Sequence, residues 1–285
     1  MSRSLLVFGL SGQIGDALRP LLAGERVQAV SRQAHASADG VEWLQGDLSD
    51  WQSTRSIDVV LSLGPLDAFA RAVSQGRVRA GRIVAFGSTS VHVKHRSPTR
   101  AERDVAQRLA EAEASLTDYC YRDGIPLFLL RPTLVWGAGR DATLSRLVAL
   151  ARRWPLLPLP LGAPGLRQPV HVADLAQAAM AALDVDGTVH GAFDLAGGET
   201  LSFGAMLERA VRIGAPKAIQ VPVPWRWVAR ALRFSAAGKG LASRLDEDLC
   251  FSDAPARAVL RWSPRRFQPE NRDFSPLQLR PALPY

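Results

Sequence analysis

The sequence has few of the residues that would indicate a disulfide framework, a metal cluster or a membrane span. Of its 285 residues only Cys120 and Cys250 are cysteines. Two cysteines fit a reducing compartment and give no reason to expect a metal. The chain has no run of about 18 apolar residues, the length that a membrane span requires. Gly9, Gly12 and Asp16 interrupt the N-terminal stretch, so we expect no signal peptide, no membrane partner and a cytoplasmic location.

Lysine is also scarce, with three residues in the chain, although the formal net charge is +8. The positive charge therefore comes from arginines, and these are scattered rather than gathered with aromatic residues in one segment. This scatter argues against a nucleic-acid partner. Two interpretations stay open, a solvated basic surface and a site for an anionic ligand such as a phosphate.

Short apolar runs alternate with helical periods in the first half of the chain. The expected strands are 4–9, 26–31, 41–44, 58–63, 82–86 and 126–130, and the expected helices are 12–23, 66–76 and 101–122. Buried parallel strands joined by helix-sized crossovers have this pattern. We therefore predict the α/β fold class, with a Rossmann-like doubly wound parallel sheet.

The alternation breaks after about residue 133. Four prolines, Pro155, Pro158, Pro160 and Pro164, predict a loop-rich stretch. A helix at 172–184 and a strand near 189–195 follow, and no regular period continues after 198. We expect residues 1–165 to form mainly a dinucleotide-binding Rossmann domain. Residues 166–285 are expected to form mainly a small C-terminal substrate lobe, with an interleaved boundary.

Three glycines stand where the first predicted strand meets the first predicted helix, in "LLVFGLSGQIGDAL" (5–18). Gly9 permits a tight turn, Gly12 lets a ligand approach the backbone, and Gly15 allows close packing of the helix on the strand. Gln13 and Ile14 complete the turn and belong to the predicted site. The start of such a helix attracts a pyrophosphate, so we predict a dinucleotide site. The alternative is a turn with a purely structural role.

The second predicted strand ends in "AVSRQ", without the carboxylate that NAD sites commonly carry there. Ser31 and Arg32 occupy its tip, and a guanidinium suits the 2′-phosphate of the alternative cofactor. We therefore expect NADP(H) to be favoured over NAD(H), unless Arg32 is only a surface residue. Asp47, in "GDLSD" (46–50), could accept a hydrogen bond from the adenine amino group. The predicted cofactor site also includes Leu48 and Leu63.

Several motifs in order resemble the extended short-chain dehydrogenase/reductase family, the NAD-dependent epimerase/dehydratase group. They are "GLSGQIG", "GDLSD", "IVAFGSTSVH" with Ser88 at the position of a catalytic Ser or Thr, "LRPTLVWGAGRD" (130–141) and "RQPVHVADLAQA" (167–178). The resemblance covers nearly the whole chain. It implies that Arg131 and Pro132 shape the cofactor pocket and that Arg167 and His171, in the substrate lobe, contact substrate.

The chain departs from this family at the residues that carry its chemistry. Family members use Tyr-x-x-x-Lys, in which the Tyr is the acid/base and the Lys lowers its pKa. With Glu113 matched to the family's downstream acid, Val105 and Leu109 occupy the two positions. None of the three tyrosines is followed by Lys four residues later. The chain thus resembles an atypical member that lacks the pair.

Other residues are candidates for the missing chemistry. Ser88 could hydrogen-bond a substrate oxygen or simply satisfy the backbone at a strand end. His92 could act as an acid or base near neutral pH. Lys94 follows it on an expected pocket rim, and the alternative for both is a solvated basic loop. Arg167 could meet a diphosphate, and His171 stands at a helix start beside Asp174, for which a structural role is expected.

These observations predict an NAD(P)-dependent epimerase/dehydratase-like enzyme or reductase. It would act at a hydroxyl or carbonyl carbon of a small-molecule substrate, with a nucleotide-sugar as one candidate. The alternative is a non-catalytic NAD(P)-binding sensor or binding module, which the missing Tyr and Lys favour. The acidic residues that open the long helix, Glu102 among them, complement its dipole. That helix is also compatible with a homodimer.

Overall fold

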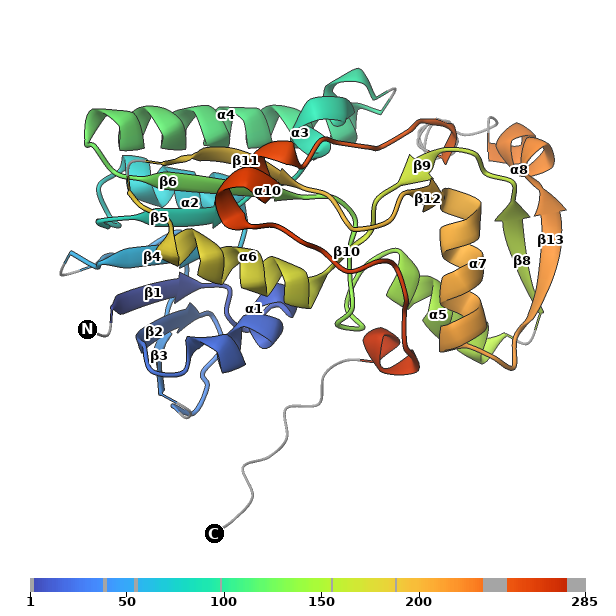
Figure 1. Cartoon of the computed structure of the whole chain (residues 1–285), viewed down its shortest axis with the longest axis horizontal. Helices are drawn as coiled ribbons and strands as arrows, with labels where there is room; N and C mark the ends of the chain where they lie inside the picture. Colours follow the sequence, from blue (N-terminus) through green and yellow to red (C-terminus); the bar gives the residue numbers. More distant parts are fainter. Residues whose placement is uncertain are drawn as a thin grey trace, which may run out of the picture.

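The computed structural model describes residues 3–37, 40–53, 56–97, 99–154, 156–187, 189–232 and 245–275. A seven-stranded sheet forms its larger region, and every neighbouring pair of strands in it is parallel (Figure 1). In spatial order the strands are β11 (Gly191–Leu195), β6 (Leu127–Pro132), β5 (Ile83–Phe86), β4 (Val59–Ser62), β1 (Ser4–Phe8), β2 (Arg26–Ser31) and β3 (Val41–Gln45). The strand order reverses direction at β1 and β4, as in a doubly wound sheet.

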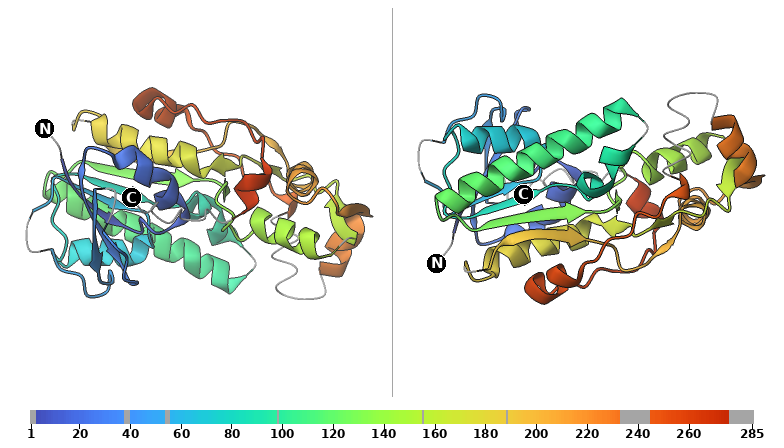
Figure 2. Two further views of the ribbon diagram at one scale, coloured as in Figure 1. Left: turned by 90° about the horizontal axis from the view of Figure 1, so that it is seen from below. Right: turned by 90° about the horizontal axis from the view of Figure 1, so that it is seen from above.

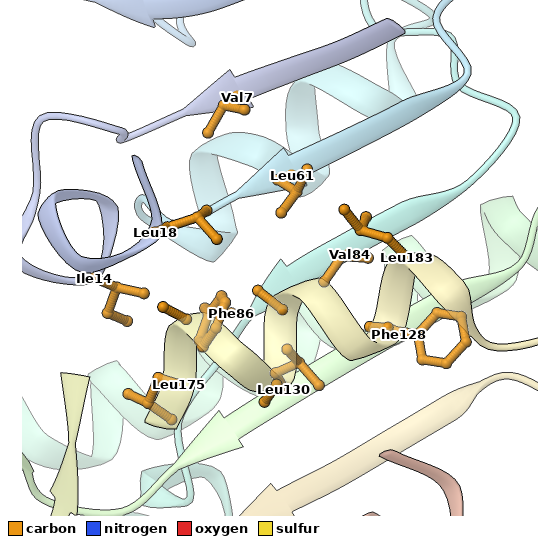
Figure 3. Packing of buried hydrophobic residues seen from close by; sticks show 14 of the residues in the cluster. Val7, Ile14, Leu18, Leu61, Val84, Phe86, Phe128, Leu130, Leu175 and Leu183 are labelled. Carbon is orange, nitrogen blue, oxygen red and sulfur yellow. The ribbon is translucent and has the colours of Figure 1, made fainter. Parts of the chain in front are cut away.

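Alternate side chains of β1 enter two different cores. Leu5 and Val7 pack with one cluster, whereas Leu6 and Phe8 pack with another, because successive residues of a strand point to opposite faces. The first core is covered by α1 (Gln13–Leu18) and α6 (Val172–Asp184), as Figure 3 shows, and the second by α2 (Leu66–Ser74) and α4 (Arg100–Arg122). The predicted fold class is therefore confirmed: helices lie on both faces of a parallel sheet.

The first helix is shorter than its apolar pattern predicts. Helix α1 ends at Leu18, and a 3₁₀ turn, η1 (Arg19–Leu22), continues the segment. Pro20 lies in that turn and has no N–H to continue the α-helical ladder. Its position explains why the helix expected over 12–23 changes type after residue 18.

A second, smaller region has its own core, in which Trp136, Met206 and Phe267 are almost fully buried. Helices α5 (Leu144–Arg153) and α7 (Phe203–Gly214) and the 3₁₀ turn η3 (Asn271–Phe274) surround this core (Figures 1 and 2). Beyond them, β8 (Leu156–Leu161) pairs in parallel with β13 (Ile219–Pro224), which leads into α8 (Trp225–Leu232).

The proline-rich stretch contains a strand, so the predicted loop is wrong over part of its length. Pro158 and Pro160 lie within β8. A two-stranded sheet has a free edge on each strand, and proline is tolerated where its missing N–H would face outward. Leu157 and Leu159 alternate with the prolines and are buried in the lobe core, which fixes the strand in place. Pro155 lies outside the described residues.

Short strands and a returning segment connect the two regions. The pair β7 (Val135–Trp136) and β10 (Val170–His171) is parallel, and the pair β9 (Leu166–Arg167) and β12 (Leu201–Ser202) is antiparallel. After the lobe, α10 (Ala254–Leu260) packs against β11 and α6 of the sheet region. The division at residue 165 stays a prediction, since α6 and β11 both follow that point in the chain. None of the described helices is long and apolar enough to cross a lipid bilayer.

Candidate functional site

The glycine turn is fixed by contacts that only glycine permits. Gly9 has φ +83°, a value that favours glycine. A Cβ on Gly15 would lie 2.1 Å from the carbonyl oxygen of Leu10, so α1 could not pack as closely with any other residue there. The Gly12 N–H donates to the Gly9 carbonyl at 2.9 Å and closes the turn. The turn thus brings bare backbone to the carboxyl end of β1.

A groove of about 880 Å³ begins at this turn. Its walls follow the ends of β1, β2 and β3, and they include five residues of the predicted cofactor site: Gly9, Ser31, Arg32, Asp47 and Leu48. Gly12, Gln13, Ile14 and Gly15 form the adjoining turn and first helical residues, and Ile14 is buried. Leu63 packs at the margin of the core instead.

The charged groups at the tip of β2 are paired. The Arg32 guanidinium lies 3.8 Å from the Asp47 carboxylate, and the side chain of Arg32 is 84% exposed. Hydrogen bonds from Ser49, and then the charge of Arg32, hold the pKa of Asp47 below its usual value. The Ser31 hydroxyl is 3.0 Å from the His35 ring. A carboxylate therefore stands beside the arginine that was expected to receive a phosphate.

A second ion pair crosses the glycine turn itself. Arg140, in the segment after β7, donates from Nη1 to the Ser11 carbonyl at 2.9 Å and to the Asp16 carboxylate at 3.3 Å. Asp16 also lies 3.6 Å from Arg19. Burial raises the pKa of Asp16, while the charges of Arg140 and Arg19 act to lower it. Sequence patterns did not predict Arg140 as a groove residue, because the partners are 129 positions apart.

A cavity of about 700 Å³ lies beyond the end of β5, between the sheet region and the smaller region. Ser88 lines it, and its Oγ donates to the hydroxyl of Ser90 at 3.0 Å. The charged residues of the lining are Lys94, Arg96, Glu102, Arg167, Asp246 and Glu247. Ser88 and Arg167, two of the predicted site residues, are thus brought to one cavity.

Glu102 is a cavity residue that sequence reasoning assigned only to the helix dipole. Its Oε2 accepts hydrogen bonds from Ser97 Oγ at 2.5 Å and Thr99 Oγ1 at 3.1 Å. The spacing of Thr99 and Glu102 is that of a capping box at the start of α4, which is the signal that marks this position in the sequence. Glu102 precedes Val105 by three residues, so the two share one face of α4.

His92 belongs to a charged network outside the cavity lining. Its Nε2 lies 3.1 Å from Asp194, whose carboxylate is 3.8 Å from Arg131. Arg131 is paired with the buried Glu113 at 2.5 Å. The His92 ring also lies against Phe251, which does line the cavity. The network thus ties the end of α3 (Ser90–Val93) to β11, β6 and α4.

The remaining predicted residues have structural contacts. Pro132 is buried, and its carbonyl accepts from the Thr89 hydroxyl at 3.2 Å. His171 is 8% exposed, and its Nδ1 accepts from the Ala173 N–H at 3.1 Å, which makes it the N-cap of α6. Arg167 donates to the carbonyls of Leu166 and Glu247, each at 2.7 Å. Neither His171 nor Pro132 is among the described residues that line the cavity or the groove.

Asp174 has the structural role expected for it. It is 4% exposed and accepts from the backbone and side-chain nitrogens of Arg265, at 3.0 and 2.8 Å. Among the described residues, no group of three or more His, Cys, Asp or Glu is arranged to hold a metal ion.

Comparisons with known proteins find similarity in structure but not in sequence. No protein-family model matches the chain, and no curated protein matches it. MoeE5 in complex with UDP-glucuronic acid and NAD has a TM-score of 0.70 at 17% identity, over 95% of this chain and 96% of that chain. UDP-glucuronic acid 4-epimerase from Bacillus cereus in complex with NAD has a TM-score of 0.68 at 14% identity, over 95% and 94%. UDP-glucose 4-epimerase from Thermotoga maritima, with UDP-glucose, has a TM-score of 0.69 at 13% identity, over 95% and 97%.

At these identities the likeness shows the fold, and it extends over 95% of this chain. The expected preference for NADP(H) is contradicted, because the neighbours MoeE5 and UDP-glucuronic acid 4-epimerase hold NAD. The pair at the tip of β2 gives a physical reason. The Asp47 carboxylate already pairs with the Arg32 guanidinium, and its negative charge would repel a phosphate brought to the same place.

Proposed function

We propose that the chain is an NAD-dependent enzyme of the epimerase type that acts at a hydroxyl-bearing carbon of a nucleotide-sugar. The observation that carries the proposal is the position of two sites at the carboxyl ends of neighbouring parallel strands. The groove follows β1 to β3 and the cavity follows β5 and β6. Ligands of open parallel sheets bind at this edge, where the strand order reverses. Structural neighbours that share the fold bind NAD and UDP-sugars.

The residues of the groove fit NAD. The first turn of α1, which follows Gly12, offers backbone N–H groups to the pyrophosphate, and Asp47 would accept a hydrogen bond from a ribose hydroxyl or the adenine amino group. Bound NAD would supply the acceptor for the hydride of the substrate carbon.

The cavity offers cations to a nucleotide-sugar. Lys94, Arg96 and Arg167 line it together with the carboxylates of Glu102, Asp246 and Glu247, and the basic groups suit the diphosphate of a nucleotide-sugar. Ser88 would hydrogen-bond the reacting oxygen. Its hydroxyl is already oriented by Ser90, whose N–H donates to Ser88 Oγ at 3.2 Å.

We assign the role of the acid/base that transfers the proton to Glu102. The chain has no Tyr-x-x-x-Lys, and His92 pairs with Asp194 outside the cavity lining. The Glu102 carboxylate lines the cavity and is held by Ser97 and Thr99. It would take the proton of the substrate hydroxyl as the carbonyl forms and return it when the carbonyl is reduced again, so the proton is balanced over a cycle.

The test is turnover of UDP-sugars by the purified protein with NAD, followed by separation of the epimers. Glu102→Gln keeps the side-chain length and should lower kcat by about 100-fold or more, with NAD affinity unchanged. His92→Ala is the matched control, and we expect its kcat to stay within about threefold of the original. Full turnover in Glu102→Gln together with loss of turnover in His92→Ala would show that His92, and not Glu102, transfers the proton.

One specific observation favours a second function, a non-catalytic NAD-binding sensor or binding module. The sequence lacks the acid/base pair that the resembled family uses. This alternative predicts tight NAD binding with no conversion of any UDP-sugar or carbonyl substrate. A protein that binds neither NAD nor NADH would exclude both functions.

A further inference from the structure

Arg140 lines the cofactor groove, although it comes from a segment far from the glycine motif in the sequence. The residue lies four positions after β7, and its side chain lines the groove together with Gly9, Ser11 and Asp16. Its Nη1 donates to the Ser11 carbonyl, inside the glycine turn, at 2.9 Å. The guanidinium therefore stands beside the backbone that a dinucleotide pyrophosphate would approach.

The backbone that carries Arg140 is held rigidly on both sides. The Gly139 N–H donates to the Asp273 carbonyl of η3 at 2.8 Å. The buried Asp141 carboxylate accepts from the N–H groups of Thr143 and Leu144, at 3.0 and 2.6 Å, and so starts α5. A residue fixed in this way loses little backbone freedom when its side chain binds a ligand.

A third contact fixes the same segment. Gly137 has φ +108°, and a Cβ there would lie 2.2 Å from Nε2 of His171. The ring of His171 packs in turn edge-on against Trp136, with 4.6 Å between the ring centroids. The predicted substrate residue His171 therefore packs against the segment that leads to Arg140, although it does not line the groove.

The side chain of Arg140 is free to change partner. It is 47% exposed, and its contact with Asp16 is 3.3 Å. Asp16 has a second cation, Arg19, at 3.6 Å, so it keeps a partner if Arg140 leaves. A pyrophosphate offers more negative charge than one carboxylate and accepts two parallel N–H bonds from a guanidinium.

We propose that Arg140 is a ligand of the dinucleotide pyrophosphate, which it binds by exchanging Asp16 for the phosphate oxygens. The inference rests on the proposed NAD site, and it adds a binding residue that comes from the lobe side of the molecule. Since the segment is bonded to η3 and α5, the binding of cofactor is coupled to the position of the lobe.

The test is calorimetric titration of the full chain with NAD, ADP and adenosine. Arg140→Ala should weaken NAD and ADP by roughly 10- to 100-fold and leave adenosine within about twofold, because adenosine has no phosphate. Arg140→Lys should recover part of the loss, since a lysine keeps the charge without the fork. Arg146→Ala, at an exposed position of α5, is the matched control and should bind as the original protein does.

Each other outcome overturns a defined statement. Equal affinity of Arg140→Ala and the original protein for NAD and ADP overturns the role of Arg140. An equal loss for ADP and adenosine also overturns it, because the residue would then only hold the groove in shape. Failure of the original protein to bind NAD or ADP overturns the proposed function first. If Arg140→Ala does not fold, Arg140→Gln keeps a donor for Ser11 and carries the same comparison.

Discussion

The groove and the cavity lie at the same edge of the sheet but are assembled differently. The groove is lined almost entirely by residues before position 69, with Arg140 as the exception. The cavity takes its lining from 88–102, 133–134, 167–168 and 246–251. Apart from Arg140, the first site is thus made by one stretch of the N-terminal part of the chain, and the second by segments that meet only in the folded chain. Local patterns therefore predict the first site far better than the second.

The two sites also differ in how their charges are arranged. In the groove, the exposed Arg32 pairs with Asp47, and the half-exposed Arg140 pairs with Asp16, whose own side chain is only 13% exposed. Behind the cavity, Arg131, whose side chain is 19% exposed, lies between Asp194 and the buried Glu113. An exposed guanidinium can exchange its partner for a ligand, whereas an arginine paired with a buried carboxylate holds the fold. The following experiments test whether this difference is real.

The largest effect is expected from Arg131→Met. The variant leaves Glu113 buried without its partner, and removing one member of such a pair costs about 3–5 kcal/mol of unfolding free energy. Chemical denaturation measures the loss, and NAD affinity should stay within about twofold. Reduced NAD affinity at unchanged stability would place Arg131 in the cofactor site after all. His92→Ala, at the exposed end of the network, should cost less than about 1 kcal/mol.

The second largest effect is expected from Gly15→Ala, which should lower both the free energy of unfolding and the affinity for NAD. The new Cβ would lie 2.1 Å from the Leu10 carbonyl oxygen, so α1 must move away from β1. We expect a loss of about 1–3 kcal/mol and a fall in NAD affinity, measured by thermal unfolding and by titration. Gly187→Ala is the control, because its Cβ would meet Pro126 at an ordinary 3.5 Å. Unchanged NAD affinity in Gly15→Ala would contradict a binding role for the turn.

A smaller effect is expected at the tip of β2. Asp47→Asn removes the carboxylate that would repel a 2′-phosphate, which at this exposed site is worth about 1 kcal/mol, or roughly fivefold. Parallel titrations should show NADP affinity rising relative to NAD affinity by that factor. Arg32→Ala is the companion variant, and NAD binding should be nearly unchanged. A large loss of NAD affinity in Arg32→Ala would show that the guanidinium contacts the cofactor directly.

The smallest change concerns the two thiols and leaves stability untouched. Burial raises the pKa of Cys120 to about 12, so at pH 8 almost none of it is thiolate. Cys250 is exposed and stands between two cavity residues, Leu249 and Phe251. Iodoacetamide at pH 8, followed by mass spectrometry, should modify Cys250 at least about tenfold faster. Equal rates would mean that the face of α4 behind the sheet opens as readily as the cavity.

Elements of the sheet region were predictable because their side chains repeat locally. The strand at 26–31 and the helix at 172–184 have the predicted bounds, and each shows an uninterrupted apolar pattern. The glycine turn was predictable for the same reason, since its three glycines and its strand and helix are adjacent in the sequence.

The rest depended on contacts between distant segments. The strand β8 forms despite two prolines because its partner β13 follows some 60 residues later and the lobe core receives its leucines. The substrate contact of His171 stays a prediction, but no local pattern showed that its ring packs against the Gly137 turn and that its Nδ1 caps α6. For Arg140 no local pattern exists, because its contact joins positions 129 residues apart.

During synthesis, the N-terminal strands of this sheet leave the ribosome before the elements that cover and pair with them. Helix α6, which covers the core formed by β1, β4, β5 and β6, begins only at Val172, and β11, which pairs with the edge of β6, follows at Gly191. A nascent chain that has emerged as far as residue 165 thus presents an apolar face that only α1 covers, together with an unpaired strand edge. We expect that fragment, made alone, to bind chaperones or aggregate, and the full chain to become stable only after residue 195 has emerged.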